Sequence, residues 1–342
     1  MENSKLLSII IPSYNMEDYL PRNLKNLIEA KDIDKIEIII INDGSTDSTL
    51  NIAKSFQEKA PQSIVVIDKK NGHYGSCLNA AIKIAKGKYF RILDADDWFE
   101  TDCLNQFTEK LCNTDSDLVV TLRVEQTMGK DGKLKAKYLP IKNVEYGKVY
   151  DASTFSIKDH SENVEFNMHS MTYKTNVIRD SRLVLPEGIC YTDMLYCLIP
   201  LRHIKTLTIF DIYLYNYFVG REGNSTNNTA IKKNLSHICT VVDCMIKYLD
   251  KQTISDVSHI VQSNQLRYLE EALNIFILSV GLHRGINKKQ YAMIRPIVAY
   301  CKKHNIEHRA WKKYYNRYWY QKNTCLSLNF CLNLYRLTHP LK

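Results

Sequence analysis

Three carboxylates follow an apolar run in the first third of the chain. The run Tyr89–Leu93 leads directly into Asp94, Asp96 and Asp97. Carboxylates this close repel one another unless a cation lies among them, and Mg²⁺ and Mn²⁺ prefer hard oxygen ligands that they share with phosphates. Because alternate residues of a strand point to the same side, Asp94 and Asp96 can reach one ligand. The alternative is a solvated, acidic strand end that begins a turn.

The elements that must position these acids alternate in type. Apolar, β-branched runs are typical of buried strands, and they occupy Leu6–Ile11, Ile36–Ile41, Ile64–Ile67, Tyr89–Leu93 and Leu118–Leu122. Helical patterns lie between them at Tyr19–Ala30, Ser48–Lys59, Gly75–Ala85 and Asp102–Leu111. This alternation predicts an α/β fold with a mostly parallel sheet covered by helices on both faces. Ligands of such sheets bind at the carboxyl ends of the strands.

Polar and turn-forming residues follow four of these runs. The segments are Pro12–Glu17, Asn42–Asp47, Asp68 with Asn71–Gly75, and Asp94–Asp97. The turn at Gly44 and the cap at Asp47 explain part of the second segment. They do not explain Asp43, whose carboxylate could accept a hydrogen bond from the imide N–H of uracil. Tyr14 would lie beside it, either stacked on the base or in ordinary packing.

Together these segments resemble a known family. The set Ile9–Asn15, Asn42–Asp47, Asn71–Asn79 and Asp94–Asp97 is similar to the family-2 inverting glycosyltransferases of the bacterial capsule and exopolysaccharide type, which have the GT-A fold. The match is dense over residues 6–100 and sparser over 165–228. It implies a metal-dependent, non-processive hexosyltransferase that uses a nucleotide-diphospho-sugar, with a UDP-sugar expected.

The resemblance also implies individual roles. Asp43 would read the uracil, Asp94 would lie near the ribose or sugar, and Asp96 would bind the Mn²⁺ or Mg²⁺ that bridges the donor phosphates. The implied donor-binding residues are Pro12, Tyr14, Asn15, Glu17, Asp43, Gly72, Asn79, Asp94, Ala95, Asp96 and Arg221. One departure is Leu78, where the family usually has an arginine. His73 or Arg91 could supply the missing contact.

An inverting transfer needs a general base that takes the proton of the acceptor hydroxyl. Leu185–Leu195 resembles the family's acidic motif at a helix start, and Asp193 matches the aspartate that serves as its base. Thr192 stands where the family often has a glutamate. The alternative for Asp193 is an acid that only stabilises the helix N-terminus, and Glu187 is then the second candidate for the base.

Two further segments flank this motif. His169 could bind the acceptor, which we favour, or be a core histidine. The loop Gly220–Ser225 carries Arg221, which could close on the donor diphosphate and neutralise the leaving group. A plain surface turn is an equal alternative for this loop.

Charge divides the chain into a predicted GT-A domain, 1–228, and a basic, mainly helical region, 229–342. Of the 46 Lys+Arg and 37 Asp+Glu, the second region holds 18 and 6, a net of +12, which leaves 28 and 31 in the first, a net of −3. Basic and aromatic residues interleave between Arg309 and Lys322. This mixture suits an anionic membrane surface. A helix packed on the enzyme is the second possibility, and a nucleic-acid partner is not favoured.

The remaining composition bounds the location and the activity. The ten cysteines form no C-x-x-C pair, and no signal peptide or run of about 20 apolar residues is present. We therefore expect a cytoplasmic enzyme, peripheral on the inner face of the cell membrane, acting on a glycan linked to a polyprenyl diphosphate. A processive synthase would need membrane helices and a Gln-x-x-Arg-Trp motif, and a nucleotidyltransferase would need a glycine-rich, basic loop after the first strand. The main alternative is a catalytically silent nucleotide-sugar-binding subunit of an assembly complex, which the intact acids disfavour.

Overall fold

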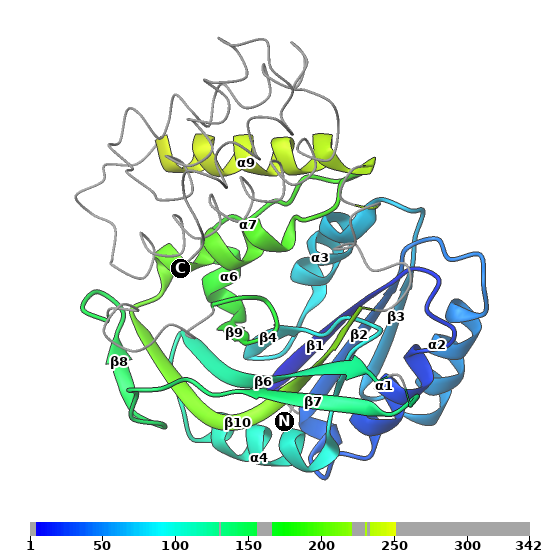
Figure 1. Cartoon of the computed structure of the whole chain (residues 1–342), viewed down its shortest axis with the longest axis horizontal. Coiled ribbons are helices and arrows are strands. Elements are labelled where there is room, and N and C mark those ends of the chain that lie inside the picture. Colours follow the sequence, from blue (N-terminus) through cyan, green and yellow to red (C-terminus); the bar gives the residue numbers. More distant parts are fainter. Residues whose placement is uncertain (1–4, 130, 156–165, 221–229, 231–232, 251–342) are drawn as a thin grey trace, which may run out of the picture. The chain divides into compact units, whose positions relative to one another are not determined.

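The computed structural model describes residues 5–129, 131–155, 166–220, 230 and 233–250. Within these residues one ten-stranded sheet has the order β3-β2-β1-β4-β9-β6-β10-β5, with β7 paired to β6 and β8 to β10 (Figure 1). The strands are β1 (Leu7–Ser13), β2 (Ile36–Asn42), β3 (Ile64–Asp68), β4 (Tyr89–Ile92), β5 (Trp98–Phe99), β6 (Leu118–Met128), β7 (Leu134–Leu139), β8 (Val149–Asp151), β9 (Met171–Lys174) and β10 (Thr206–Val219).

The first four strands are parallel, as the alternation predicted. Parallel pairs join β3 to β2, β2 to β1 and β1 to β4. Every residue of β2 is buried, which is why this strand is a continuous β-branched run instead of an alternating one. The carboxyl ends of the four strands therefore meet at one edge, where the polar segments lie.

The second half of the sheet is mixed. β9 lies antiparallel between β4 and β6, β10 runs parallel to β6, and the short β5 is antiparallel to β10. β6 and β7 form an antiparallel hairpin, and Gly132 adopts a φ of 75° in its turn. Because β5 directly follows the Asp94–Asp97 turn, its pairing with β10 brings that turn against the distal half of β10.

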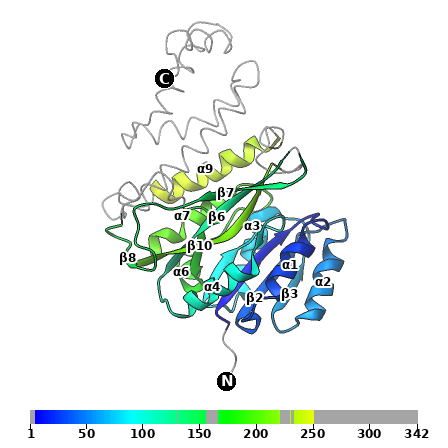
Figure 2. The ribbon, with the colours of Figure 1, turned by 60° about the horizontal axis from the view of Figure 1, so that its bottom comes forward.

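Helices cover both faces of the sheet (Figures 1 and 2). They are α1 (Leu20–Ile28), α2 (Thr49–Lys59), α3 (His73–Ile84), α4 (Thr101–Cys112), α6 (Thr175–Asp180) and α7 (Asp193–Leu198), with 3₁₀ turns η1 (Ile33–Lys35) and η2 (Pro200–His203). The main core joins the sheet to α1, α2 and α4 through side chains such as Leu24, Ala53 and Phe107. On the other face α3 buries Leu78 and Ala81. The structure thus confirms the predicted fold class.

Helix α9 (Leu235–Asp250) belongs to a second compact unit. Its buried residues Ile238, Val241, Val242 and Met245 recur at three- and four-residue spacing, the pattern of a helix with one apolar face. Among the described residues, the helices lack the combined length and apolar character that a bilayer span requires. The predicted basic and aromatic segment lies outside the described residues.

Candidate active site

Side chains of α1 hydrogen-bond the Asp94–Asp97 turn. The side-chain amide of Asn23 donates to the carbonyl oxygens of Asp94 at 3.1 Å and Asp97 at 2.9 Å. The Arg22 guanidinium donates to the carbonyl oxygen of Asp96 at 3.0 Å. These bonds satisfy three backbone carbonyl groups of the turn and therefore fix its conformation.

Asp97 ties this turn to β10. Its Oδ2 accepts a hydrogen bond from the Tyr215 hydroxyl at 2.7 Å, and its Oδ1 accepts one from the Phe218 amide at 2.7 Å. The Tyr215 oxygen also accepts from the Asp94 amide at 3.1 Å. Burial, followed by the neighbouring Asp96 and Asp94 carboxylates, raises the pKa of Asp97 well above its usual value. The site therefore concentrates negative charge that a cation would relieve.

We expect Tyr215→Phe to lower the free energy of unfolding by about 1–3 kcal/mol, because it leaves Asp97 Oδ2 and the Asp94 amide without their buried partner. Urea denaturation measures the change. Tyr213→Phe is the matched control, since Tyr213 lies on the same strand and contacts Tyr138 through its ring. Equal stability of the two variants would contradict a structural role for the Tyr215 hydroxyl.

Tyr74, on α3, is bonded to the acidic turn. Its hydroxyl donates to Asp94 Oδ1 at 2.8 Å and lies 3.3 Å from the Met168 sulfur. Burial, then the charges of Asp94 and Asp193, raise the pKa of Tyr74. The phenol stays neutral, and both carboxylates lie close enough to act on it. Asp193 is the first residue of α7, and its role as the base stays a prediction.

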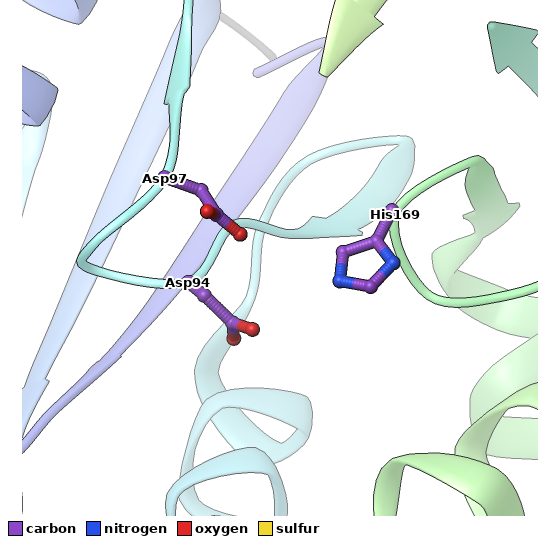
Figure 3. Close-up of side chains that lie close together, drawn as sticks. All are labelled: Asp94, Asp97 and His169. Atoms are coloured by element: carbon purple, nitrogen blue, oxygen red, sulfur yellow. The ribbon is translucent and has the colours of Figure 1, made fainter. Parts of the chain in front are cut away.

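His169 faces the acidic turn from the loop before β9 (Figure 3). Ligand atoms of Asp94, Asp97 and His169 lie within 4.8 Å of one another. Burial, then the charges of Arg123 and Arg91, lower the pKa of His169 to about 3, so the ring is neutral and can ligate at neutral pH.

These three residues fit a divalent cation. Two carboxylates and one imidazole form a donor set that Mn²⁺ accepts, and among the described residues the buried His169 Nδ1 has no hydrogen-bond partner. Asp96 lies outside this group, so its role as the metal ligand stays a prediction. The favoured placement of His169 on the acceptor side also stays untested.

Asp43 is anchored at the end of β2. Its Oδ1 accepts hydrogen bonds from the Lys69 ammonium at 2.6 Å and the Gly72 amide at 2.9 Å. Lys69 also donates to Ser76 Oγ at 2.8 Å. Lys69 was missed from the sequence, although its place directly after the third strand was a signal. Lys69 therefore fixes the orientation of the Asp43 carboxylate.

The segment after β1 accepts hydrogen bonds from the loop that precedes α2. Asn15, at a φ of 53°, accepts a hydrogen bond from the Thr46 amide at 2.9 Å, and the Glu17 carboxylate accepts one from the Ser48 amide at 2.9 Å. The predicted donor contacts of Asn15 and Glu17 are untested. The two hydrogen bonds show that both side chains position the loop before α2. Tyr14 is 48% exposed and available for stacking.

Asn79 holds the segment that leads into α7. Its Nδ2 donates to the Leu185 carbonyl at 2.9 Å and to Glu187 at 3.1 Å, and its Oδ1 accepts from the Leu185 amide at 2.9 Å. Gly75 permits the close approach, since a Cβ there would collide with the Pro186 carbonyl. The structure therefore places Asn79 where it positions the Asp193 segment, while its predicted donor contact is untested.

If the chain transfers a sugar, Asn79→Ala should lower the turnover rate by about 10- to 100-fold, because a small displacement of a catalytic group is costly. Donor affinity should change little. Asn26→Ala is the matched control: Asn26 makes a similar bond to the Phe99 carbonyl at 2.9 Å, on α1. Loss of donor affinity in place of turnover would instead favour the donor role of Asn79.

Two remaining suggestions concern the missing arginine. Arg91 is fully buried and donates to the His169 carbonyl at 2.6 Å and Thr172 Oγ1 at 2.7 Å. Arg91 therefore does not supply the contact made by the arginine that the family usually has at the position of Leu78. That suggestion was wrong because the apolar strand β4 buries the whole Arg91 side chain. His73 begins α3 at a φ of 61°. Arg221 lies outside the described residues.

The glycosyl transferase family 2 model matches residues 8–168. The chain is 35% identical over 135 residues to a chondroitin synthase of Pasteurella multocida, covering 38% of this chain and 13% of that protein. It is 26% identical over 222 residues to a poly(ribitol-phosphate) beta-glucosyltransferase of Bacillus spizizenii, covering 64% of this chain and 33% of that one.

The fold has a counterpart among solved structures. The crystal structure of residues 1–349 of S. aureus TarS in complex with UDP-GlcNAc aligns with a TM-score of 0.60 at 16% identity, over 87% of this chain and 81% of that one. The matched residues 8–168 contain β1, β2, Asp43 and the Asp94–Asp97 turn, and they end at the residue before His169. Residues 8–168 therefore form a family-2 glycosyltransferase domain, and the described residues have the GT-A fold.

Proposed function

We propose that this protein transfers a hexosyl group from a UDP-sugar to a glycan acceptor, with inversion and without processivity, in the synthesis of a cell-surface polysaccharide. The observation that carries the proposal is the group of Asp94, Asp97 and His169, whose ligand atoms lie within 4.8 Å of one another at the end of the parallel strands. A cation-binding group and a carboxylate on a separate element are what an inverting sugar transfer needs.

The donor base would bind at the end of β2. Asp43 is held through Oδ1 by Lys69 and Gly72, and its carboxylate would accept from the imide N–H of uracil. The exposed ring of Tyr14 would stack on the base. UDP-GlcNAc bound in TarS supports a uridine nucleotide here.

The donor diphosphate would lie towards Asp94, Asp97 and His169. A bound Mn²⁺ or Mg²⁺ supplies charge neutralisation for the leaving UDP. Asp96 and Arg221 remain the family-implied contacts to the metal and the diphosphate.

Asp193 would act as the base. Its carboxylate takes the proton of the acceptor hydroxyl while that oxygen attacks the anomeric carbon from the face opposite the UDP leaving group, which inverts the configuration. Asp193 is the first residue of α7. The Tyr74 phenol donates a hydrogen bond to Asp94. Asp94 would therefore stay with the cation while Asp193 acts as the base.

The acceptor is proposed to be a glycan linked to a polyprenyl diphosphate. The chondroitin synthase and the poly(ribitol-phosphate) beta-glucosyltransferase relatives support a polymer of the cell surface. The net charge of +12 over residues 229–342 supports docking of a peripheral cytoplasmic enzyme on an anionic membrane surface.

A donor screen tests this proposal. Thermal stability is measured with UDP-glucose, UDP-galactose, UDP-GlcNAc, GDP-mannose and dTDP-rhamnose, each with and without Mn²⁺. A ligand at 100 times its dissociation constant adds about 2.7 kcal/mol of stability. We expect a Mn²⁺-dependent increase with one UDP-sugar, and NMR of the product to show the inverted anomer. No response to any nucleotide sugar in folded protein would refute the proposal.

A further inference from the structure

Asp43, directly after β2, is held through its backbone as well as its side chain. Its amide donates to the Ser13 carbonyl oxygen at 2.8 Å, and its carbonyl oxygen accepts from the side-chain amide of Asn71 at 2.9 Å. The Asp43 side chain is only 4% exposed. The protein therefore sets the direction from which a ligand can meet the Asp43 carboxylate.

One oxygen of this carboxylate is already filled. Oδ1 accepts from the Lys69 ammonium at 2.6 Å and from the Gly72 amide at 2.9 Å. A carboxylate has about four lone-pair sites, two on each oxygen, so these two donors take the capacity of Oδ1. The Cys77 thiol is a further, weak donor close by, and burial, then the charge of Asp43, raise the pKa of Cys77 to about 12. Asp43 can therefore offer a ligand no more than its second oxygen.

Lys69 uses its whole donor capacity inside the protein. An ammonium group has three N–H donors, and Lys69 gives them to Asp43 Oδ1, to Ser76 Oγ at 2.8 Å and to the Lys70 carbonyl oxygen at 2.8 Å. Gly72 leaves room for this arrangement, because a Cβ there would lie 2.6 Å from Ser76 Oγ and 3.2 Å from Lys69 Nζ. Lys69 therefore acts on a nucleotide through Asp43 and not as a phosphate ligand.

The nucleobases differ in what they present to a carboxylate. Uracil has a single ring N–H between two carbonyl groups, which one carboxylate oxygen can accept. Guanine has a ring N–H and an amino group side by side, and a carboxylate accepts this pair with both of its oxygens. When Oδ1 of Asp43 is filled, one of the two guanine donors is left without an acceptor, and this weakens binding.

We propose that Lys69 is a positioning residue that sets the base selectivity of the donor site: by filling Oδ1 of Asp43 it favours uracil nucleotides over guanine nucleotides. The inference rests on the proposed function, in which Asp43 reads the base, and deepens it by naming the residue that limits the choice of nucleotide. Removal of the Lys69 ammonium frees one lone pair of Oδ1, so that guanine can engage both oxygens.

The test is isothermal titration of the full chain, in the presence of Mn²⁺, with UDP, GDP and N3-methyl-UDP. We expect UDP to bind about tenfold or more tightly than GDP, because a donor left unpaired costs roughly that much affinity. N3-methyl-UDP lacks the imide N–H and should also bind about tenfold more weakly than UDP. Lys69→Met should lower the ratio of UDP affinity to GDP affinity about fivefold or more. Loss of a positive charge alone would weaken both nucleotides together and leave this ratio unchanged.

Lys70→Met is the matched control, because Lys70 is the next residue, its side chain is exposed and only its backbone contacts Lys69. It should keep the ratio of the unmodified protein. Ser76→Ala removes one acceptor of Lys69 and should lower the ratio by less than Lys69→Met; it decides the test if Lys69→Met does not fold.

The outcomes separate this inference from the proposed function. Equal affinity of the unmodified protein for UDP and GDP, or an unchanged ratio in the Lys69 and Ser76 variants, overturns the inference alone. Equal binding of UDP and N3-methyl-UDP would refute the reading of the base by Asp43 and the inference with it. Absence of binding by every nucleotide would refute the proposed function itself.

Discussion

Replacement of Asp193 by asparagine is expected to lower the rate of sugar transfer by about two to four orders of magnitude, with the fold and the donor affinity retained. Asparagine has the same shape but cannot take a proton from the acceptor hydroxyl. Asp193 lies on α7, outside the matched family domain at 8–168, and its charge contributes to the raised pKa of Tyr74, whose hydroxyl is bonded to Asp94. Turnover with the donor found in the screen is the measurement.

The control separates catalysis from helix stabilisation. Asp102 is likewise an acid in a helix first turn, that of α4, so Asp102→Asn loses only the dipole interaction of about 0.3–1 kcal/mol. If Asp193→Asn behaves like Asp102→Asn, Asp193 only stabilises its helix. Glu187→Gln then becomes the variant to measure, although the bond from Asn79 to Glu187 favours a positioning role for that residue.

The parallel half of the fold could be predicted because its signals are local. Each strand from β1 to β4 is an apolar run with one turn-forming segment at its end. Such runs can be recognised in the sequence without knowing which strands pair with them. The same reasoning placed Asp43 and the Asp94–Asp97 turn at a common edge. Only the ends of the elements differ, by a few residues.

The second half of the site depends on long-range pairing that no local pattern encodes. β9 is four residues long and is inserted antiparallel between β4 and β6. This insertion carries His169 to the acidic turn. β10 brings Tyr215 to Asp97 across more than a hundred residues of chain, and neither its register nor this hydroxyl could be read from the sequence.

Some residues of the matched motifs make contacts within the protein. The amide of Asn79, whose predicted donor contact is untested, pairs with the backbone of Leu185. Arg91 had the right charge for a phosphate, yet Thr172 and the His169 carbonyl take its donors. A motif match specifies a residue type at a position, whereas the direction of a side chain follows from neighbours that are distant in sequence.

Replacement of His169 by phenylalanine is expected to weaken Mn²⁺ binding by about 100-fold or more and to reduce transfer in proportion, because a metal ligand contributes at least as much as the residues that support it. Phenylalanine keeps a ring beside Tyr215 and Tyr217, whose centroids lie 4.8 and 4.5 Å from that of His169. Packing is therefore preserved while the nitrogen ligand is lost. Isothermal titration with Mn²⁺ in the presence of UDP gives the affinity.

Asp94→Asn and Asp96→Asn complete the comparison and decide between two arrangements of the metal. If the cation lies among Asp94, Asp97 and His169, then Asp94→Asn and His169→Phe weaken it together, and Asp96→Asn has the smaller effect. If Asp96 is the principal ligand, as the family resemblance implies, Asp96→Asn abolishes binding while His169→Phe binds Mn²⁺ like the unmodified protein. That second result would remove His169 from the metal site, and the histidine would then be assigned to the acceptor side, because its ring still faces the acidic turn (Figure 3).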